Sequence, residues 1–320
     1  MAGRSTVARA SEPMNRRGLF SGVLIAMGAG WGLSIPLTKI AVSGGYQPFG
    51  LVFWQVAIVA ALLGGINHVR GRRRTSGLFA RPSKHKVRTW LAIAFLGALL
   101  PDVFVYTAAY HLPGGVLSIL ISSVPIFAFP IALALGNDVY RSMRLAGLAL
   151  GMAGVVVLFA PEARLPESAA TIFIPIALLG PLCYAAEVNY VARWGTAGMD
   201  AIQALLGASI FAMAISGPVA IASGQWINPM PPYGAPDIAL VLGAAIHGLV
   251  YAIYVWLTGR AGAVFASQTS YLVTGFGMLW SMTLLGENYS GHIWAAFLLM
   301  LAGMALVQIN PGRGSTSKAS

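Results

Sequence analysis

The sequence predicts an all-α polytopic membrane protein with ten transmembrane helices arranged as two inverted five-helix repeats. Three observations lead to this fold class: an apolar composition, ten apolar runs of spanning length, and a pattern that occurs twice with its charge changed. Of the 320 residues, 57% are hydrophobic and 9% are charged, whereas about one-quarter of the residues in a soluble domain are charged. A chain of this composition is expected to lie in a membrane.

The apolar runs set the number of crossings. A helix needs roughly 20 apolar residues to cross a hydrocarbon core about 30 Å thick. The spanning segments must be helical because unpaired amides are too costly in lipid. Little chain is left between the runs, so no attached soluble domain is expected. The ten runs are 19–41, 48–67, 90–110, 114–135, 143–160, 171–192, 201–223, 237–258, 263–285 and 291–309.

The basic residues predict the orientation of the chain. If the N-terminus is cytoplasmic, all of the 20 Lys and Arg residues except Lys39 and Arg164 fall on the cytoplasmic side. An excess of Lys and Arg marks cytoplasmic loops, so we expect a multi-pass protein of the cytoplasmic membrane with both termini inside the cell. The basic loop 70–88 is expected to contact anionic lipid headgroups. The net charge of +11 therefore indicates a membrane surface rather than a nucleic-acid partner.

A sequence pattern occurs twice, and only one of its two copies carries basic residues. The stretch ALGNDVYRSMRLAGLALGMAG at 134–154 and the stretch LLGENYSGHIWAAFLLMLAG at 284–303 share a glycine turn between two apolar runs. Only the first copy carries arginines, Arg141 and Arg144. Five helices is an odd number, so two homologous halves must insert in opposite orientations, and only the first turn then faces the cytoplasm. Inverted repeats are a transporter architecture.

The same residues carry a resemblance to a known family. The stretch GAGWGLSIPLTKIA at 28–41, the segment from Leu117 to Leu158 and the segment from Ser270 to Val307 resemble the EamA-type transporters of the drug/metabolite transporter superfamily. The resemblance covers 19–309 and implies two inverted five-helix repeats around a central cavity that opens alternately to each side. Two departures are Asn137 in the first Gly-acid turn and Thr274 in place of the second-half proline.

This resemblance divides the chain into four parts. The expected parts are a cytoplasmic N-terminal tail at 1–18, a first EamA-like repeat at 19–160, a second EamA-like repeat at 171–309 and a cytoplasmic tail at 310–320.

Two acids lie inside predicted spans, Asp102 and Glu187. An ionised acid at a helix centre costs ~2.5–3.5 kcal/mol on insertion scales, so an intramembrane acid is a functional candidate. Both are candidates for a proton-coupling residue. Glu187 is preferred because Tyr184 and Asn189 give it polar neighbours. The alternative is that each acid only forms hydrogen bonds that tie helices together.

Aromatic and polar side chains at helical spacing are predicted to line a cavity around these acids. Asp102 and Tyr106 share one helical face, as do Tyr184 and Glu187. The alternative is that such tyrosines pack between helices, with each hydroxyl on a backbone carbonyl. The predicted cavity residues are Trp31, Asp102, Tyr106, Ser118, Ser122, Tyr184, Glu187, His247, Tyr251, Tyr254, Gln268 and Tyr271.

Other residues are expected to have structural or conformational roles. Pro36 and Pro125 are predicted hinges because proline kinks helices. Lys39 is expected to extend its amine to the outer membrane interface. Cys183 is the single cysteine, so neither an internal disulfide nor a cysteine zinc site is expected. No cofactor and no metal site are expected.

These observations favour a secondary transporter over an enzyme. The sequence has no Walker-A loop, no His-Glu-x-x-His helix and no Gly-x-Ser-x-Gly elbow, so ATP hydrolysis by this chain is excluded. The predicted partner is a small metabolite or amino-acid-like solute, with efflux favoured and proton coupling left open; a homodimer is compatible with it. The alternatives are an uptake permease, a lipid flippase or, less well supported, an integral membrane enzyme that uses Asp102 and His247.

Overall fold

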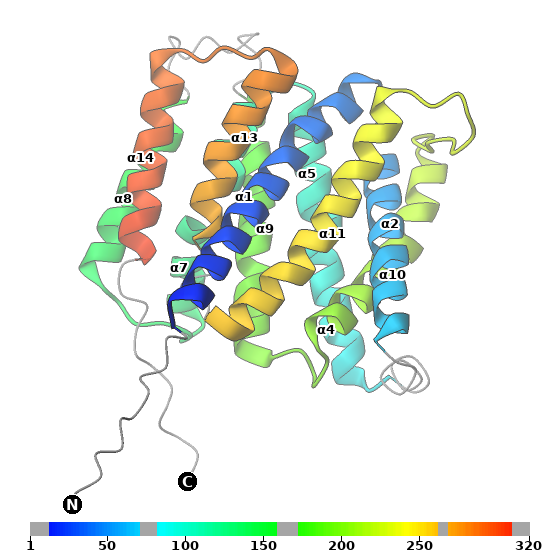
Figure 1. Ribbon diagram of the computed structural model, residues 1–320, viewed down its shortest axis with the longest axis horizontal. Coiled ribbons are helices and arrows are strands. Elements are labelled where there is room, and N and C mark those ends of the chain that lie inside the picture. The colour runs from blue at the N-terminus through cyan, green and yellow to red at the C-terminus, as the bar shows by residue number, and fades with distance from the viewer. Residues whose placement is uncertain (1–12, 71–81, 159–171, 262–267, 309–320) are drawn as a thin grey trace, which may run out of the picture.

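The computed structural model describes residues 13–70, 82–158, 172–261 and 268–308, and within these ranges it contains helices and turns but no strand (Figure 1). A single π-helical turn, η1, joins two of the helices. The first-half elements are α1 (Pro13–Ser43), α2 (Pro48–Val69), α4 (Lys84–Ala94), η1 (Phe95–Leu99), α5 (Leu100–Ala109), α6 (Gly114–Ile121), α7 (Val124–Ala134) and α8 (Ser142–Val157). The second-half elements are α9 (Phe173–Trp194), α10 (Ala201–Ala222), α11 (Ala235–Ala261), α13 (Thr269–Leu285) and α14 (Gly291–Gln308).

Each of the ten predicted apolar runs contains a helix, although the ends of four runs lie outside the described residues. Helices α4, η1 and α5 form one continuous segment, Lys84–Ala109. Seven segments of the described chain are long and apolar enough to cross a membrane, and α8 and α14 contain shorter apolar helices. The chain is therefore a multi-pass membrane protein. The seven segments are Gly18–Ser43, Pro48–Val69, Lys84–Ala109, Gly114–Ala134, Phe173–Trp194, Ala201–Ala222 and Ala235–Tyr254.

Local sequence explains several helix ends. Pro48 stands in the first turn of α2, where its missing N–H costs no hydrogen bond. A capping box of Asp200 and Gln203 begins α10, and such reciprocal bonds satisfy free amides of the first turn. Gly286 ends α13 with a φ of 67°, a left-handed conformation that glycine adopts at little steric cost.

The fourth predicted run is broken and its second-half counterpart is not. Helix α6 ends at Ile121, and α7 starts at Val124 with Pro125 in its first turn. Proline lacks the N–H that would continue the helix. In α13, Thr274 donates its hydroxyl to the carbonyl of Ser270 at 2.9 Å, and the helix runs from Thr269 to Leu285 without interruption. Pro36 lies inside α1, which also continues past it.

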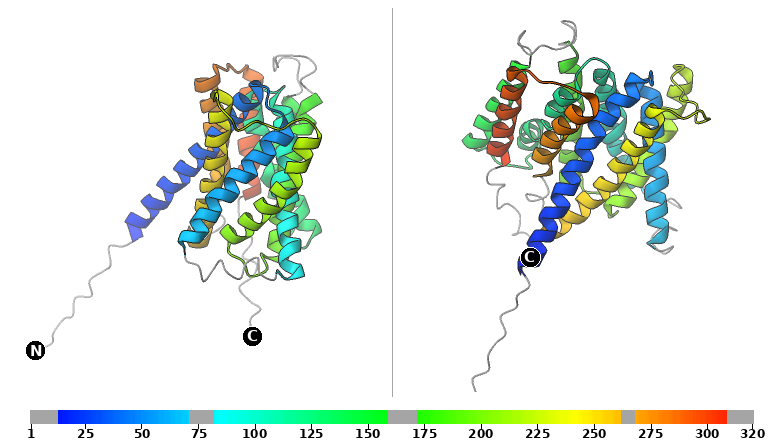
Figure 2. Two further views of the ribbon diagram at one scale, coloured as in Figure 1. Left: turned by 90° about the vertical axis from the view of Figure 1, so that its right-hand side faces the viewer. Right: turned by 45° about the horizontal axis from the view of Figure 1, so that its top comes forward.

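Helices from the two halves pack against each other. Helix α1 lies between α11 and α13, α14 lies along α8, and α10 lies along α2 (Figures 1 and 2). Small residues permit these approaches, as is common in membrane helices. A Cβ atom on Gly32 would lie 2.8 Å from the backbone nitrogen of Gly277, and one on Gly303 would lie 2.5 Å from that of Gly151.

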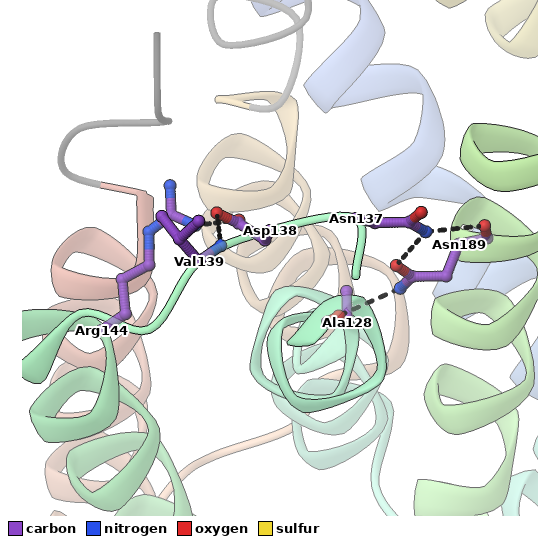
Figure 3. Close-up of polar contacts among 6 residues, drawn as sticks. All are labelled: Ala128, Asn137, Asp138, Val139, Arg144 and Asn189. Atoms are coloured by element: carbon purple, nitrogen blue, oxygen red, sulfur yellow. Dashed lines mark hydrogen bonds and ion pairs between the residues drawn. The ribbon is translucent and has the colours of Figure 1, made fainter. Parts of the chain in front are cut away.

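The helical bundle has two ends, and the contacts between loops show which loops lie at each end. At the basic end, which carries Arg70, Arg88, Arg141, Arg144 and Arg193, Arg70 pairs with Asp200 at 3.3 Å. The first-copy turn lies at the same end. Figure 3 shows Asn137 donating to Asn189 on α9, and Arg144 paired with Asp138.

The second-copy turn lies at the opposite end. The Glu287 carboxylate accepts from the amides of Gly114 and Gly115 at 2.7 and 3.1 Å. Tyr289 donates to the same carboxylate at 2.6 Å. The turn between α13 and α14 is thereby bound to the start of α6, so this contact joins the two halves of the chain.

Candidate functional site

The interior polar site is centred on Asp102, in the first turn of α5. Its side chain is buried and accepts two hydrogen bonds, from Gln55 Nε2 at 2.6 Å and from the Tyr184 hydroxyl at 2.9 Å. The Tyr106 hydroxyl donates to Gln55 Oε1. Helices α2, α5 and α9 are therefore joined by one network, and each donor to Asp102 is neutral.

Helical spacing predicts that Asp102 shares a face with Tyr106, and Tyr184 with Glu187, but it does not point to Gln55. The structure joins the first pair through Gln55 instead of by direct contact. An amide in the middle of the apolar run 48–67 was an available signal. A polar side chain in a membrane helix needs an internal partner.

Glu187 lies one helical turn beyond Tyr184 on α9 and faces η1. A Cβ atom on Gly97 would lie 2.7 Å from the Glu187 carboxyl carbon, so a side chain there would displace the carboxylate. A π-helical turn such as η1 is rare in proteins, but where one occurs it is often at a functional site. Within the described residues, Glu187 makes no hydrogen bond, and Asp102 is the charged side chain that acts on it. Tyr251 of α11 lies within electrostatic range of Glu187.

Aromatic side chains of α1 and α11 form a second part of the interior. The Trp31 ring centroid lies 5.6 Å from that of Tyr254 and 6.3 Å from that of His247. The buried indole nitrogen of Trp31 has no hydrogen-bond partner in the part of the chain that the structure describes. Since Tyr251 and Tyr254 are neighbours in the same helix and interact, this aromatic group extends toward Glu187.

Three of the predicted cavity residues lie apart from the acids. Gln268 is exposed at the start of α13. Ser118 donates to the carbonyl of Thr274 at 2.9 Å and so binds α6 to α13. Ser122 donates to the carbonyl of Ile119 in its own helix.

Lys39, whose amine is predicted to reach the outer membrane interface, is bound to the backbone at the end of the molecule opposite the basic end. Its amine donates to the carbonyl oxygens of Ala109 and Tyr110, at 2.6 and 3.3 Å, where the last turn of α5 leaves carbonyls without helical partners.

Two cavities lie between the acids and the end opposite the basic end. The inner one, between α1, α2, α5 and α11, has a volume of only about 10 Å³, and Gln55 and Tyr106 form part of its wall. The outer one has a volume of about 420 Å³. The outer cavity is lined by Gly45, Gln47, Pro48, Thr107, Tyr110 and His111. Within the described residues no group of three or more His, Cys, Asp or Glu could hold a metal ion.

The apolar spanning helices define a polytopic helical membrane protein, and the acids in its interior mark the candidate functional site. The chain belongs to the EamA-like transporter family, whose model matches it twice, at residues 18–160 and 171–309. The resemblance inferred from the sequence is therefore confirmed, and the chain is a membrane transporter by family.

The proteins that are similar to this chain include two curated proteins and a solved structure. The chain is 27% identical to the "Uncharacterized transporter YvbV" of Bacillus subtilis (strain 168) over 311 residues, covering 92% of each chain. It is 25% identical to "Protein PecM" of Dickeya dadantii (strain 3937) over 227 residues, 68% of this chain and 74% of that protein. A solved crystal structure shares the fold with a TM-score of 0.55 and 18% identity, covering 91% of this chain and 96% of that chain.

Proposed function

We propose that this protein is a secondary transporter that moves a small metabolite or amino-acid-like solute out of the cell by alternating access. The observation that carries the proposal is an acid from each half of the chain in one interior region, Asp102 on α5 and Glu187 on α9. Transporters place their substrate and ion sites at such repeat interfaces.

The proposed topology is ten spans in two inverted repeats, 19–160 and 171–309, with both termini in the cytoplasm. The two matches of the family model support the duplication. The separation of the basic end from the end that carries Glu287 supports the inversion. The basic end is the proposed cytoplasmic face, and the 70–88 loop, of which 71–81 lie outside the described residues, is proposed to contact anionic lipid.

Movement between the two access states is proposed to use the helix break before Pro125 and the proline inside α1, Pro36. Helix α6 packs mainly against α13 and α7 mainly against α9, while both also contact α14. The serines between α6 and α7 are the proposed point at which the two parts move relative to each other.

Proton coupling is proposed to use Glu187, with Asp102 as the next candidate. The Asp102 carboxylate is occupied by Gln55 and Tyr184, whereas the Glu187 carboxylate has no hydrogen bond within the described residues. A group without fixed partners can change its proton affinity as access changes. Substrate and proton need only disfavour each other by ~1–3 kcal/mol for antiport.

Transport is tested by comparing metabolites in cells and medium with and without the protein. Cells that produce the wild type should deplete at least one solute internally and enrich it outside, and Glu187→Gln should reverse that change at equal protein level. Enrichment inside the cell would indicate uptake. An unchanged distribution of every solute, with the protein present in the membrane, would contradict transport.

Coupling is tested in proteoliposomes with the solute so identified. Under coupling, Glu187→Gln protein should keep counterflow exchange when the solute concentration is high enough to saturate the variant, but it should lose uptake driven by a pH gradient. If the variant responds to the pH gradient like the wild type, Glu187 is not the proton-coupling residue and Asp102 becomes the candidate. Movement of a labelled phospholipid without any solute flux would favour the flippase alternative.

A further inference from the structure

The interior acids lack a positively charged partner in the described part of the chain. The charged side chain that interacts electrostatically with Glu187 is a second acid, Asp102, and no described Lys or Arg has such an interaction with it. Asp102 is satisfied by the neutral donors Gln55 and Tyr184. An interior carboxylate without a countercharge is costly. A ligand cation would supply the charge that the described residues do not.

The described basic side chains with printed partners are engaged elsewhere. Lys39 binds backbone carbonyls at the end opposite the basic end. Arg70, Arg88 and Arg144 bind partners at the basic end. A ligand carboxylate in the interior would therefore meet acids instead of bases. Like charges at short range in a low dielectric repel strongly, so organic acids and zwitterionic amino acids are disfavoured.

Aromatic rings beside Glu187 suit a cation that carries an apolar body. Tyr251 lies within electrostatic range of both Glu187 and Tyr254, and Trp31 packs 5.6 Å from Tyr254. The face of a tryptophan or tyrosine ring attracts an ammonium group. The same rings offer apolar surface to an aromatic or aliphatic substituent.

We propose that the site formed by Glu187, Asp102 and the rings of Trp31, Tyr251 and Tyr254 binds a monocationic amine that has an apolar body and no carboxylate. This substrate class depends on the transport function proposed above and narrows it. The ammonium binds the Glu187 carboxylate, which packs directly against Gly97 because that position has no side chain. The apolar body lies against the rings of α1 and α11.

The test uses four probes that share one phenyl ring: phenethylamine, 2-phenylethanol, phenylacetate and phenylalanine. Each competes with radiolabelled phenethylamine for purified full-length protein at pH 7. Phenethylamine should compete at a concentration at least about tenfold lower than each of the other three, since one charge-assisted hydrogen bond is worth about that factor. Equal or better competition by phenylacetate or phenylalanine, or no specific binding of the amine, would overturn the proposal.

Two matched carboxyl variants locate the binding. Glu187→Gln keeps the side-chain volume but removes the charge, and it should weaken phenethylamine binding by about tenfold or more. Asp237→Asn removes a carboxylate at the opposite end, where Asp237 accepts from Tyr46 at 2.5 Å, and it should leave binding unchanged. Melting temperatures of both variants confirm that they are folded. If both variants weakened phenethylamine binding equally, the amine would not bind at Glu187 and the proposed site would be wrong.

Failure of this proposal is distinguishable from failure of transport. If cells export a neutral or anionic solute in the metabolite comparison, the transport function stands and the cationic substrate class is wrong. If purified protein prefers the amine as expected but no solute changes its distribution in cells, the site assignment stands and the transport function is wrong.

Discussion

At the scale of single residues, Gln55 is the side chain whose partners most clearly define the interior network. It donates to Asp102 and accepts from Tyr106. Replacing Gln55 therefore leaves one carboxylate oxygen of Asp102 and the hydroxyl of Tyr106 without these partners, and both side chains are buried. Unpaired buried polar groups cost about 1–3 kcal/mol each.

Gln55→Ala should lower the free energy of unfolding by at least about 1–3 kcal/mol for that reason. The measurement is the melting temperature of purified protein in detergent. Gln47→Ala is the matched control because Gln47 is exposed and its side chain makes no capping hydrogen bond. Equal melting temperatures for the two variants would show that the network does not stabilise the fold.

Gly97→Ala should separate function from stability. The added Cβ would meet the end of the flexible Glu187 side chain at 2.7 Å, so the carboxylate can move aside while the backbone stays in place. We expect a small change in melting temperature but clear loss of phenethylamine binding. Gly65→Ala is the control, since a Cβ there meets nothing within 4 Å. Unaltered binding by the Gly97 variant would remove Glu187 from the binding site.

Tyr46, between α1 and α2, gives a prediction for alkaline pH. Burial, together with the hydrogen bond to Asp237, raises the pKa of Tyr46 to about 12, above an unfolded value near ~10. The neutral hydroxyl thus stabilises the fold below pH ~10, and this contribution is lost as the pH rises through the folded pKa. The difference in melting temperature between wild type and Tyr46→Phe should therefore shrink from pH 9 to pH 11. A constant difference would contradict the assignment.

At the scale of elements, the contact between the Glu287 turn and the start of α6 joins the two halves of the chain. Glu287 accepts from two free amides of the first turn of α6, where a negative charge is also favoured by the helix dipole. A Cβ on Gly115 would collide with the Tyr289 ring, so the glycine pair is needed for this approach.

Glu287→Ala should destabilise the protein by about 1–3 kcal/mol, because the amides of Gly114 and Gly115 lose their acceptor. Thermal unfolding in detergent measures the effect. Asn288→Ala serves as the control, since Asn288 is exposed and makes a long bond of 3.4 Å to Gly286. If the Glu287→Ala protein were as stable as the control, the turn would be held by its apolar neighbours instead.

Helix positions were predictable from the sequence because a lipid-spanning helix needs roughly 20 predominantly apolar residues. The contacts were not, because hydropathy does not say which helices are neighbours. For this reason Gln55 was missed, and the approach of Gly97 to Glu187 was not foreseen. Gln268 was predicted to add a polar group to the cavity wall, but it is exposed at the start of α13. The intramembrane acids were found because their desolvation is costly wherever they lie.

At the scale of the whole molecule, the proposed alternating access depends on the two halves presenting similar elements to opposite sides of the membrane. The family model matches each half separately. The first-copy turn lies with the arginines at the basic end, and the second-copy turn lies at the other end. Alternating access by inverted repeats requires that these ends face different compartments.

The most direct measurement labels one cysteine at a time in intact cells. Cys183 is the single native cysteine, so Cys183→Ser gives a cysteine-free background. Ser142→Cys and Asn288→Cys then place exposed thiols in or beside the two copies of the turn. A membrane-impermeant maleimide should label the Asn288 variant in intact cells and the Ser142 variant only after permeabilisation. Labelling of both variants in intact cells, or of neither until permeabilisation, would contradict the inverted repeat and the alternating access built on it.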